Sequence, residues 1–330
     1  MNEIDFILPW VDGTDEEWIK ERDQYLAVPT GGKENSRFRD WENLQYWFRG
    51  VEKFAPWVGH IYFVTWGHVP EWLNTEHPKL TVVRHEDYIP AQYLPTFSSH
   101  PIELNLHRIK GLSQQFVYFN DDTFLIDQVQ PTDFFKNGLP RDHCIETALV
   151  QNDIDNPFAS ILMNDAALVN MHYAKRAVIR KHWKKWFHPA YGTMVFRNLL
   201  MLPYKEFSSF KYSHISSAFL KSTFEKVWVE EEAVLDRTCR SRFRSFSDVN
   251  QYVMKYWQYM EGDYAPQSPG FGRFYTIGLH DEQIHRTIRG QQSKMICIND
   301  TEKIGDFERQ KKRIRDSFES ILPEKSAFEL

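Results

Sequence analysis

The sequence lacks the long apolar segment that a membrane-spanning helix requires. No uninterrupted run of hydrophobic residues exceeds four positions, whereas a spanning helix needs roughly 20 mostly apolar residues. Glycine and proline are also sparse, at 15 and 16 of 330 residues, which excludes fibrous and low-complexity architectures. Hydrophobic residues make up 42% of the chain and aromatic residues 15%. This composition predicts a folded protein with an ample core.

Cysteine is scarce as well. Cys144, Cys239 and Cys297 are odd in number, widely spaced and form no CxxC pair, so we expect neither a disulfide framework nor a zinc knuckle. Residues 1–5 show no basic and apolar secretory signal. Both features favour a cytoplasmic protein. The net charge of -5 argues against a nucleic acid as the partner.

Several common catalytic motifs are missing. The chain contains no Gly-x-x-x-x-Gly-Lys-Ser/Thr phosphate loop and no GxGxxG dinucleotide turn. It also contains no GxSxG nucleophile elbow and no HExxH zinc motif. A nucleoside triphosphatase or a dinucleotide oxidoreductase is therefore poorly supported.

Apolar segments alternate with amphipathic ones over the first 130 residues. The predicted strands cover residues 4–11, 60–65, 80–84 and 115–120, and the predicted helices cover residues 15–28, 40–55 and 101–110. This alternation predicts an α/β fold with a mostly parallel sheet flanked by helices. Ligands of such sheets bind beyond the carboxyl ends of the strands.

Acidic residues follow two of the predicted strands, and Trp66-Gly67 follows a third. Asp12 follows the first, and Asp121 and Asp122 follow the last, so we expect them to converge on one crevice. Paired carboxylates can hold a divalent cation against a diphosphate. Because side chains alternate along a strand, only one of the two Asp residues faces a ligand unless the chain turns there. Gly13 would let the backbone approach a ligand closely.

The remainder of the chain is mainly helical in pattern. Helices are predicted over residues 172–187, 196–202, 217–234 and 247–261, followed by a loop over 263–272, a strand over 294–298 and a helix over 302–322. Basic residues cluster at 180–186 and 309–315, and both clusters are typical of solvated helix faces. The first mixes Trp with Lys, which leaves contact with a membrane surface or an anionic glycan open.

Four blocks of sequence carry a family resemblance. They are Ile4 to Trp18, with Trp10-Val11-Asp12-Gly13-Thr14-Asp15; Arg37 to Asp122, with Leu106-His107-Arg108-Ile109 and Phe119-Asn120-Asp121-Asp122; Trp186 to Gly262, with Arg242-Phe243-Arg244-Ser245; and Lys294 to Glu329, with Ile298-Asn299-Asp300. Together they resemble the Stealth family of bacterial capsular and exopolysaccharide phosphotransferases. This family is similar to the animal N-acetylglucosamine-1-phosphotransferase.

The resemblance implies a GT-A-like or Rossmann-like nucleotide-sugar-binding sheet with a helical insertion. Residues 1–130 would form the nucleotide-sugar-binding core, residues 131–290 a mainly helical region contacting acceptor and phosphate, and residues 291–330 a strand and helix that return to the core. The implied reaction transfers hexose- or N-acetylhexosamine-1-phosphate from a nucleotide sugar such as UDP-GlcNAc. The acceptor is a hydroxyl of a growing cell-surface polysaccharide, and a nucleoside monophosphate is released. The implied cofactor is Mg²⁺ or Mn²⁺.

The resemblance also implies roles for individual residues. Either Asp121 or Asp122 would accept the acceptor proton, and His188 and Arg244 would stabilise the transferring phosphoryl group. The expected metal ligands are Asp122, Asn299 and Asp300. The expected nucleotide-sugar contacts are Trp10, Asp12, Gly13, Asp15, Arg39, Asn105 and Arg108. The expected acceptor is lipid-linked, with peripheral contact at the inner face of the plasma membrane.

Two other functions remain open from the residues themselves. A metal-dependent glycosyltransferase would use the same crevice, attack the anomeric carbon and release a nucleoside diphosphate. A non-catalytic glycan- or membrane-binding protein would use the Trp/Lys segment and would tolerate loss of Asp122 or Arg244.

Overall fold

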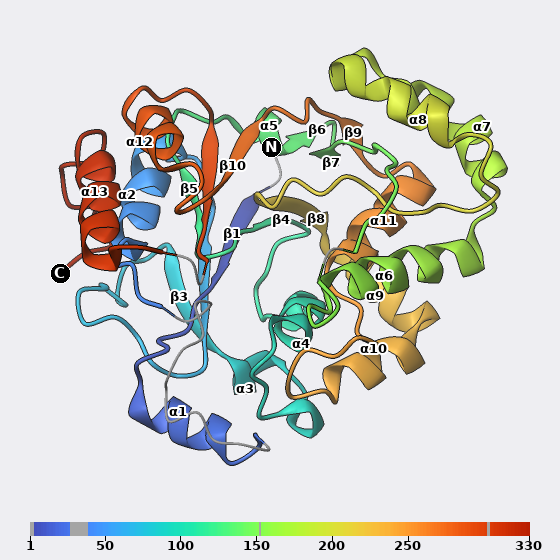
Figure 1. Ribbon diagram of the computed structural model, residues 1–330. Helices are drawn as coiled ribbons and strands as arrows, with labels where there is room; N and C mark the ends of the chain where they lie inside the picture. Colours follow the sequence, from blue (N-terminus) through green and yellow to red (C-terminus); the bar gives the residue numbers. More distant parts are fainter. Residues whose placement is uncertain (1–2, 27–38, 152, 302–303) are drawn as a thin grey trace.

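A five-stranded sheet forms the centre of the computed structural model, which describes residues 3–26, 39–151, 153–301 and 304–330. The strand order is β3-β2-β1-β4-β8 (Figure 1). The parallel strands are β1 (Ile4–Pro9), β2 (Ile61–Thr65), β3 (Leu80–Arg84) and β4 (Gln115–Tyr118). Only β8 (Ser217–Leu220) is antiparallel, beside β4 at the edge. The predicted mostly parallel α/β sheet is confirmed.

Both faces of this sheet are buried under helices. Phe6 and Ile7, neighbours on β1, are both fully buried, but they belong to two different core clusters. Side chains alternate across a strand, so these clusters lie on opposite faces of the sheet. One face is covered by α2 (Leu44–Phe54), α12 (Asp281–Arg289) and α13 (Phe307–Glu319). The other is covered by α3 (His85–Tyr88), α4 (Ser99–Leu104), α6 (Phe158–His172), α9 (Lys221–Glu230), α10 (Glu232–Cys239) and α11 (Tyr252–Glu261).

Two small sheets flank the central one. In the first, β11 (Met295–Asn299) lies between β10 (Gly272–Thr276) and β5 (Thr123–Leu125), which follows β4 after a turn. The second contains β6 (Phe135–Lys136), β7 (Leu139–Asp142) and β9 (Ala265–Pro266). The last predicted strand is therefore present, but it pairs with β5 in a separate sheet and not with the central strands.

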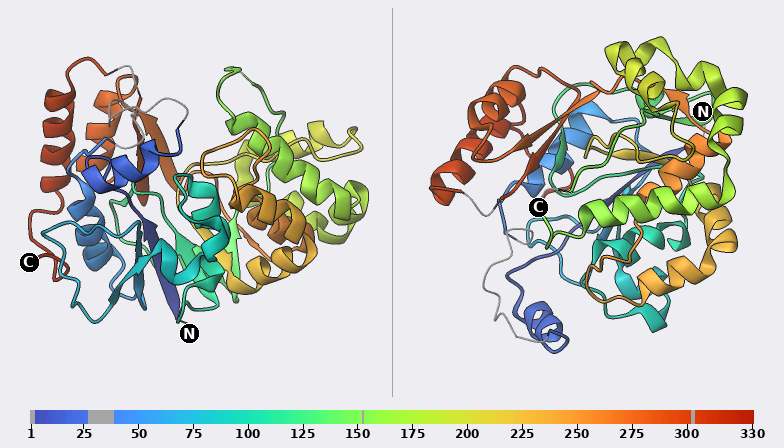
Figure 2. Two further views of the ribbon diagram at one scale, coloured as in Figure 1. Left: turned by 90° about the horizontal axis from the view of Figure 1, so that it is seen from below. Right: turned by 45° about the vertical axis from the view of Figure 1, so that its right-hand side comes forward.

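The remaining helices lie outside these layers. α1 (Glu16–Asp23) follows β1, and α5 (Pro131–Phe134) precedes β6. α7 (Lys175–Trp186) and α8 (Val195–Met201) lie together at one corner of the molecule, far from α1 (Figures 1 and 2). Short 3-10 turns occur at Ala91–Tyr93, Leu106–Arg108 and Pro189–Met194. None of the described helices is long and apolar enough to cross a bilayer.

Local chemistry explains several helix ends. The Asp15 carboxylate accepts a hydrogen bond from the Trp18 N–H and caps α1. α11 ends at Gly262, whose φ of 78° is the left-handed conformation that glycine adopts without strain. Asp306 caps α13 by accepting from the Arg309 N–H. This helix therefore begins at residue 307, whereas we expected it from residue 302, which lies outside the described residues.

The helix predicted over residues 217–234 is wrong at its start. Residues 217–220 form β8, which pairs with β4 from about one hundred residues earlier, and the helices begin only at Lys221. A strand partner that far away leaves no local periodicity to detect. The helix expected over residues 172–187 is α7, whereas α6, which begins at Phe158, was not predicted. The elements β10 and α12 were not predicted either. The three cysteines are buried and unpaired.

Candidate active site

The loops after β1 and β2 meet at the carboxyl edge of the central sheet. The Asp12 N–H donates to His68 Nε2 at 2.7 Å, which joins the two loops. Asp12 Oδ1 accepts from the Thr14 N–H at 2.8 Å, so its carboxylate shapes the turn that contains Gly13. Asp15 Oδ2 lies 3.4 Å from His68 Nδ1. Burial lowers the pKa of His68 against the effect of Asp15 and Asp12, so the ring is neutral at pH 7.

Trp10 is positioned by packing on this edge. Its ring stacks on Phe63 of β2, with centroids 5.7 Å apart, and meets the His68 ring edge-on at 5.3 Å. The predicted nucleotide-sugar contacts Trp10, Asp12 and Asp15 therefore occupy one loop system. This loop system lies beyond the carboxyl ends of the strands, where ligands of such sheets bind.

The chain turns at Asp121 and Asp122, between β4 and β5. The Thr123 N–H donates to the Asn120 carbonyl at 3.1 Å. This turn removes the strand alternation that would place the two carboxylates on opposite faces. The Asp121 side chain is exposed, yet protein surrounds its carboxyl, and this desolvation together with the nearby Asp122 charge raises the pKa of Asp121 to about 7.

His214 and Cys297 gather around Asp122. Asp122 Oδ2 lies 3.6 Å from His214 Nε2, and the donor atoms of Asp122, His214 and Cys297 all lie within 4.8 Å of one another. Burial and the Asp122 charge raise the pKa of the Cys297 thiol, which is therefore neutral. We did not predict His214. It stands just before β8, and because β8 is antiparallel to β4, this segment starts at the edge where β4 ends.

The loop that carries Arg244 lies within electrostatic range of the same imidazole. Arg244 Nη2 donates to Ser99 Oγ at 3.0 Å. Burial lowers the pKa of His214, but the carboxylates of Asp122 and Glu103 outweigh burial and raise it overall, while the positive charge of Arg244 opposes them. Arg244 and Asp122 thus both act on the charge of His214. The structure brings these two predicted residues to one region.

Contacts of the residues next to Arg244 hold its loop in place. Phe243 stacks on Phe97 with centroids 5.5 Å apart. Asp248 Oδ2 lies 2.9 Å from His100 Nδ1 and accepts from the Ser245 N–H at 2.8 Å. Since Phe97 also meets Trp18 of α1 edge-on at 6.0 Å, the β1 loop and the Arg244 loop are connected through aromatic rings.

The predicted metal ligands are only partly brought together. Asp300 accepts from Arg39 Nη1 at 3.3 Å and from Trp41 Nε1 at 3.0 Å, so both of its oxygens are engaged by protein groups. The pKa of Asp300 is raised by burial despite these partners. Asn299 lies closer to the acidic turn, because the neighbouring Ile298 N–H donates to the Asp122 carbonyl at 2.9 Å. Arg39 is positioned here by Asp300.

Three predicted site residues lie elsewhere. Asn105 is fully buried: its Nδ2 donates to the Pro101 carbonyl at 2.8 Å and its Oδ1 accepts from Arg108 Nε at 2.9 Å, so its polar atoms stabilise the fold. Arg108 also packs over the Trp228 ring at 4.8 Å. His188 accepts from the Ala190 N–H and lies near Lys136 and Arg141. Within the described part of the chain, no hydrogen bond or ion pair joins His188 to Asp122 or Arg244. The order of these residues in the sequence does not show which groups surround them, because those neighbours come from other parts of the fold.

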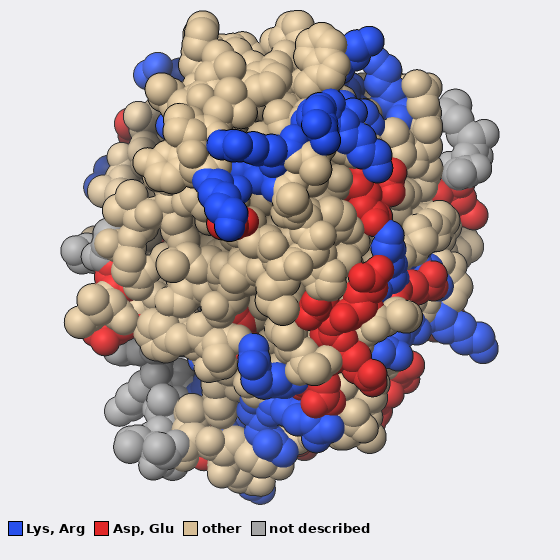
Figure 3. Space-filling view, turned by 90° about the vertical axis from the view of Figure 1, so that its right-hand side faces the viewer, with Lys and Arg blue, Asp and Glu red and all other residues tan. Residues whose placement is uncertain are grey.

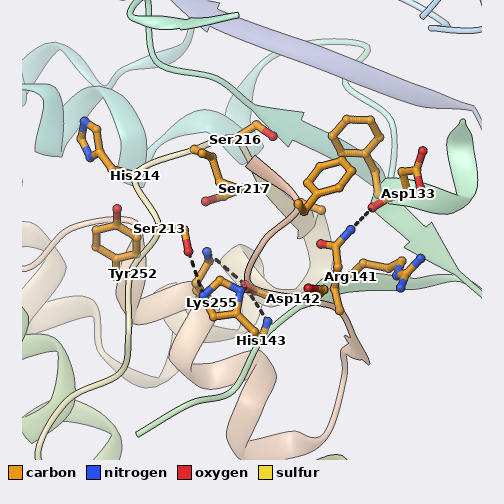
Figure 4. Close-up of a pocket in the computed structure, with 16 residues that line it drawn as sticks. Asp133, Arg141, Asp142, His143, Ser213, His214, Ser216, Ser217, Tyr252 and Lys255 are labelled. Carbon is orange, nitrogen blue, oxygen red and sulfur yellow. Dashed lines mark hydrogen bonds and ion pairs between the residues drawn. The ribbon is translucent and has the colours of Figure 1, made fainter. Parts of the chain in front are cut away.

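A small pocket of about 20 Å³ lies beside β8, and His214 is one of the residues that line it (Figure 4). Lys255 Nζ lies 3.0 Å from Asp142 Oδ2, and Ser213 Oγ lies 3.0 Å from His143 Nε2. Figure 4 shows this buried network at one end and His214 at the other. The network therefore anchors the segment that presents His214 to Asp122.

Comparison with known proteins identifies the family. Stealth protein conserved region 1 matches residues 2–27, conserved region 2 matches residues 37–142, and conserved region 4 matches residues 286–330. The chain is 39% identical over 332 residues to the capsular polysaccharide phosphotransferase WcwK of Streptococcus pneumoniae, covering 100% of this chain and 98% of the relative. It is 39% identical over 331 residues to the exopolysaccharide phosphotransferase cps2G of Lactiplantibacillus plantarum, covering 99% and 96%. The receptor polysaccharide phosphotransferase WefC of Streptococcus gordonii is 37% identical over the full length of both chains.

The chain belongs to the Stealth family. The β1 loop falls in conserved region 1, the acidic turn in region 2, and Asn299 and Asp300 in region 4. His188, His214 and Arg244 fall between regions 2 and 4. The fold thus assembles the site from three matched regions and one intervening segment.

Proposed function

We propose that this chain transfers a sugar 1-phosphate from a nucleotide sugar to a hydroxyl of a growing cell-surface polysaccharide and releases a nucleoside monophosphate. Its full-length relatives are named polysaccharide phosphotransferases, and this chain is accordingly a phosphotransferase enzyme. The donor is proposed to be UDP-GlcNAc or a related hexose or N-acetylhexosamine nucleotide. The acceptor is proposed to be lipid-linked, so that the enzyme works in the cytoplasm at the inner face of the plasma membrane.

One observation carries the proposal. Asp122 Oδ2 of the acidic turn lies 3.6 Å from His214 Nε2 at the sheet edge where α/β folds bind ligands, and the Arg244 guanidinium lies within electrostatic range of the same imidazole. Negative and positive groups in one place suit a diphosphate, since a cation can bridge the carboxylates to phosphate oxygens and an arginine fork binds phosphate oxygens directly.

The transfer itself needs one bond made and one broken. The acceptor hydroxyl oxygen attacks the sugar-linked phosphorus in line, and the phosphoanhydride bond breaks so that its bridging oxygen leaves with the nucleoside monophosphate. The hydroxyl proton passes to a carboxylate, and we assign this role to Asp121 because desolvation and the neighbouring Asp122 charge raise the pKa of its carboxyl to about 7. Arg244 stabilises the charge on the transferring oxygens. His214 holds Asp122 in position.

The site fits a divalent cation through part of the predicted ligand set. Carboxylate and amide oxygens are ligands that Mg²⁺ and Mn²⁺ prefer, and Asp122, at the turn, and Asn299 offer them. Asp300 fits less well because Arg39 and Trp41 occupy its oxygens. We therefore propose that Asp122 and Asn299 hold the cation. Bound there, the cation would neutralise charge on the diphosphate.

Product analysis tests the reaction. The purified chain is incubated with Mg²⁺, an oligosaccharide acceptor and a panel of nucleotide sugars including UDP-GlcNAc, and the products are analysed by ³¹P NMR and nucleotide chromatography. We expect UMP and a new phosphodiester signal. Release of UDP with a phosphorus-free glycan would replace this proposal with a glycosyltransferase, and no turnover of any donor would contradict catalysis.

Matched variants test the residues. Asp122→Asn and Arg244→Ala are each expected to lower kcat roughly 10²–10³-fold, as for the loss of one transition-state-stabilising group. Arg240→Ala is the control, because Arg240 lies in the same loop but pairs with Asp236 at 2.7 Å on the surface. Equal activity of Arg244→Ala and Arg240→Ala would remove Arg244 from the mechanism.

A further inference from the structure

An apolar surface is exposed on α8 and the segment that follows it. Its members are Phe196, Leu199, Leu200, Leu202 and Tyr204, which are 60%, 45%, 73%, 38% and 60% exposed. We call these five residues the apolar patch. Large apolar side chains gathered on a soluble surface mark an interaction site, whereas single ones need no explanation.

The inner side of α8 holds the apolar patch in a fixed orientation. Asn198 is buried, and its amide donates to the carbonyls of Trp186 at 2.6 Å and Cys144 at 2.9 Å. Its Oδ1 accepts from the Glu146 N–H at 2.7 Å. Met201 faces the core as well. Because Asn198 and Met201 fix the inner side of this helix, its outward leucine and phenylalanine side chains are held in place by the fold.

Basic side chains surround the apolar patch. Arg176, Arg180, Lys181 and Lys184 are exposed on α7, and Arg197 and Lys205 are exposed beside the patch itself. We call these six residues the basic collar. Figure 3 views the side of the molecule on which α7 and α8 lie: one group of Lys and Arg side chains lies in its upper part, and a band of acidic side chains separates it from a second basic group below. The chain as a whole is negative, at -5, so this local excess of positive charge is distinctive.

Most charges of the basic collar are not neutralised within the protein. Among the residues that the structure describes, Lys205 is the only one of the six that forms an ion pair. Its Nζ lies 3.5 Å from Glu206 Oε1, and both side chains are highly exposed. Trp183, on α7 between these cations, is 56% exposed. Tryptophan and tyrosine prefer the boundary between hydrocarbon and water, where one part of the ring system is apolar and the other hydrated.

We propose that the apolar patch and the basic collar dock this protein on an anionic bilayer surface. The leucine and phenylalanine side chains enter the boundary of the acyl chains, and the Lys and Arg side chains extend to lipid phosphates. A second copy of the chain is a poorer occupant, because a symmetric contact would place the two basic collars against each other. The docking does not depend on the proposed transfer reaction, although it suits a lipid-linked acceptor.

Vesicle sedimentation tests the docking. The full purified chain is mixed with large vesicles of phosphatidylcholine containing about one third phosphatidylglycerol, or of phosphatidylcholine alone, in 0.1 M or 0.5 M salt. We expect binding only to the anionic vesicles and weaker binding in high salt. Each basic residue near the surface strengthens binding roughly fivefold. Arg176→Gln/Arg180→Gln/Lys181→Gln/Lys184→Gln is therefore expected to bind roughly 600-fold more weakly.

A second variant tests the apolar patch separately. Phe196→Ser/Leu200→Ser removes two highly exposed apolar side chains and is expected to weaken vesicle binding at least tenfold. The matched controls are Val229→Ser, since Val229 is 84% exposed on α9, and Arg309→Gln/Lys312→Gln on α13, which changes the second basic cluster. Both controls should bind like the unchanged protein. Circular dichroism confirms that each variant is folded.

Two results would overturn the docking. One is found in the sedimentation assay: either the unchanged protein binds neither kind of vesicle in 0.1 M salt, or the patch and collar variants bind the anionic vesicles as well as the control variants do. The other is gel filtration showing a dimer that Phe196→Ser/Leu200→Ser converts to a monomer, since the patch would then be a contact between copies. Turnover of a nucleotide sugar with a soluble acceptor should be unchanged in all these variants, which separates a failure of docking from a failure of the proposed reaction.

Discussion

Removing the cation of a buried ion pair should destabilise the helical region strongly. Lys175, at the start of α7, places Nζ 2.7 Å from Glu146 Oε1 and 2.7 Å from the Met201 carbonyl. The two charged side chains are only 1% and 0% exposed. This pair connects the segment after β7 with α7 and with the end of α8.

The magnitude follows from this burial. In Lys175→Met, the Glu146 carboxylate stays buried, and of its polar contacts only the Ser208 N–H at 3.3 Å remains. Breaking a buried pair by removing one partner costs about 3–5 kcal/mol, because the other charge is left uncompensated. The double variant Glu146→Gln/Lys175→Met removes both charges, so we expect it to be more stable than Lys175→Met alone.

The pH dependence has a definite sign. Burial already raises the pKa of Glu146, and Lys175 opposes this shift. Without Lys175 the pKa of Glu146 rises further, so its protonation removes the buried charge at a higher pH. The stability difference between Lys175→Met and the unchanged protein should therefore shrink as the pH falls from 7.5 to 5.5.

Urea denaturation followed by tryptophan fluorescence measures these differences at both pH values. The reasoning is refuted if Lys175→Met costs less than about 1 kcal/mol at pH 7.5, the range of an exposed pair. A cost that grows towards pH 5.5 would refute it equally. A double variant less stable than Lys175→Met would show that the two residues contribute independently of their charges.

Three further predictions concern the core, the cap of α1 and the site. Trp47 is fully buried and meets Phe48 and Phe119 edge-on at 5.1 and 5.4 Å. Trp47→Ala should therefore lower the free energy of unfolding by about 3–5 kcal/mol, measured by urea denaturation. A loss below about 1 kcal/mol would contradict this. Asp15→Ala should lower the free energy of unfolding by about 1 kcal/mol because the α1 cap is lost, whereas Asp15→Asn should lower it little because Asn also caps helices. Equal losses for the two variants in urea denaturation would show that Asp15 does not stabilise α1 as a cap. The Phe274 ring is 44% exposed, and its centroid lies 5.6 Å from that of the His214 ring. If a sugar ring of the acceptor stacks on Phe274, Phe274→Ala should raise the KM for the acceptor several-fold and leave kcat nearly unchanged. An unchanged KM in steady-state assays would contradict this stacking.

The sequence located the acidic turn but not its partners. A strand that ends in two carboxylates can be read from adjacent residues, and a parallel sheet fixes where strand ends meet, so Asp12 and Asp122 were predictable. His214 was not, because its position depends on β8 pairing antiparallel with β4 across about one hundred residues. For Asn105, the family resemblance implied a nucleotide-sugar contact, whereas the residue is fully buried and hydrogen-bonded inside the fold.

By itself, the sequence determined the class of fold and the family, because strand and helix periodicity and short ordered motifs depend on neighbouring residues alone. Tertiary structure decided which charged groups share a neighbourhood. It set Asp300 against Arg39 and Trp41, placed Arg244 near the imidazole beside Asp122, and left His188 with Lys136 and Arg141. Electrostatic interactions act over ångströms in space, and residues hundreds of positions apart reach that range only when packing and strand pairing bring them there.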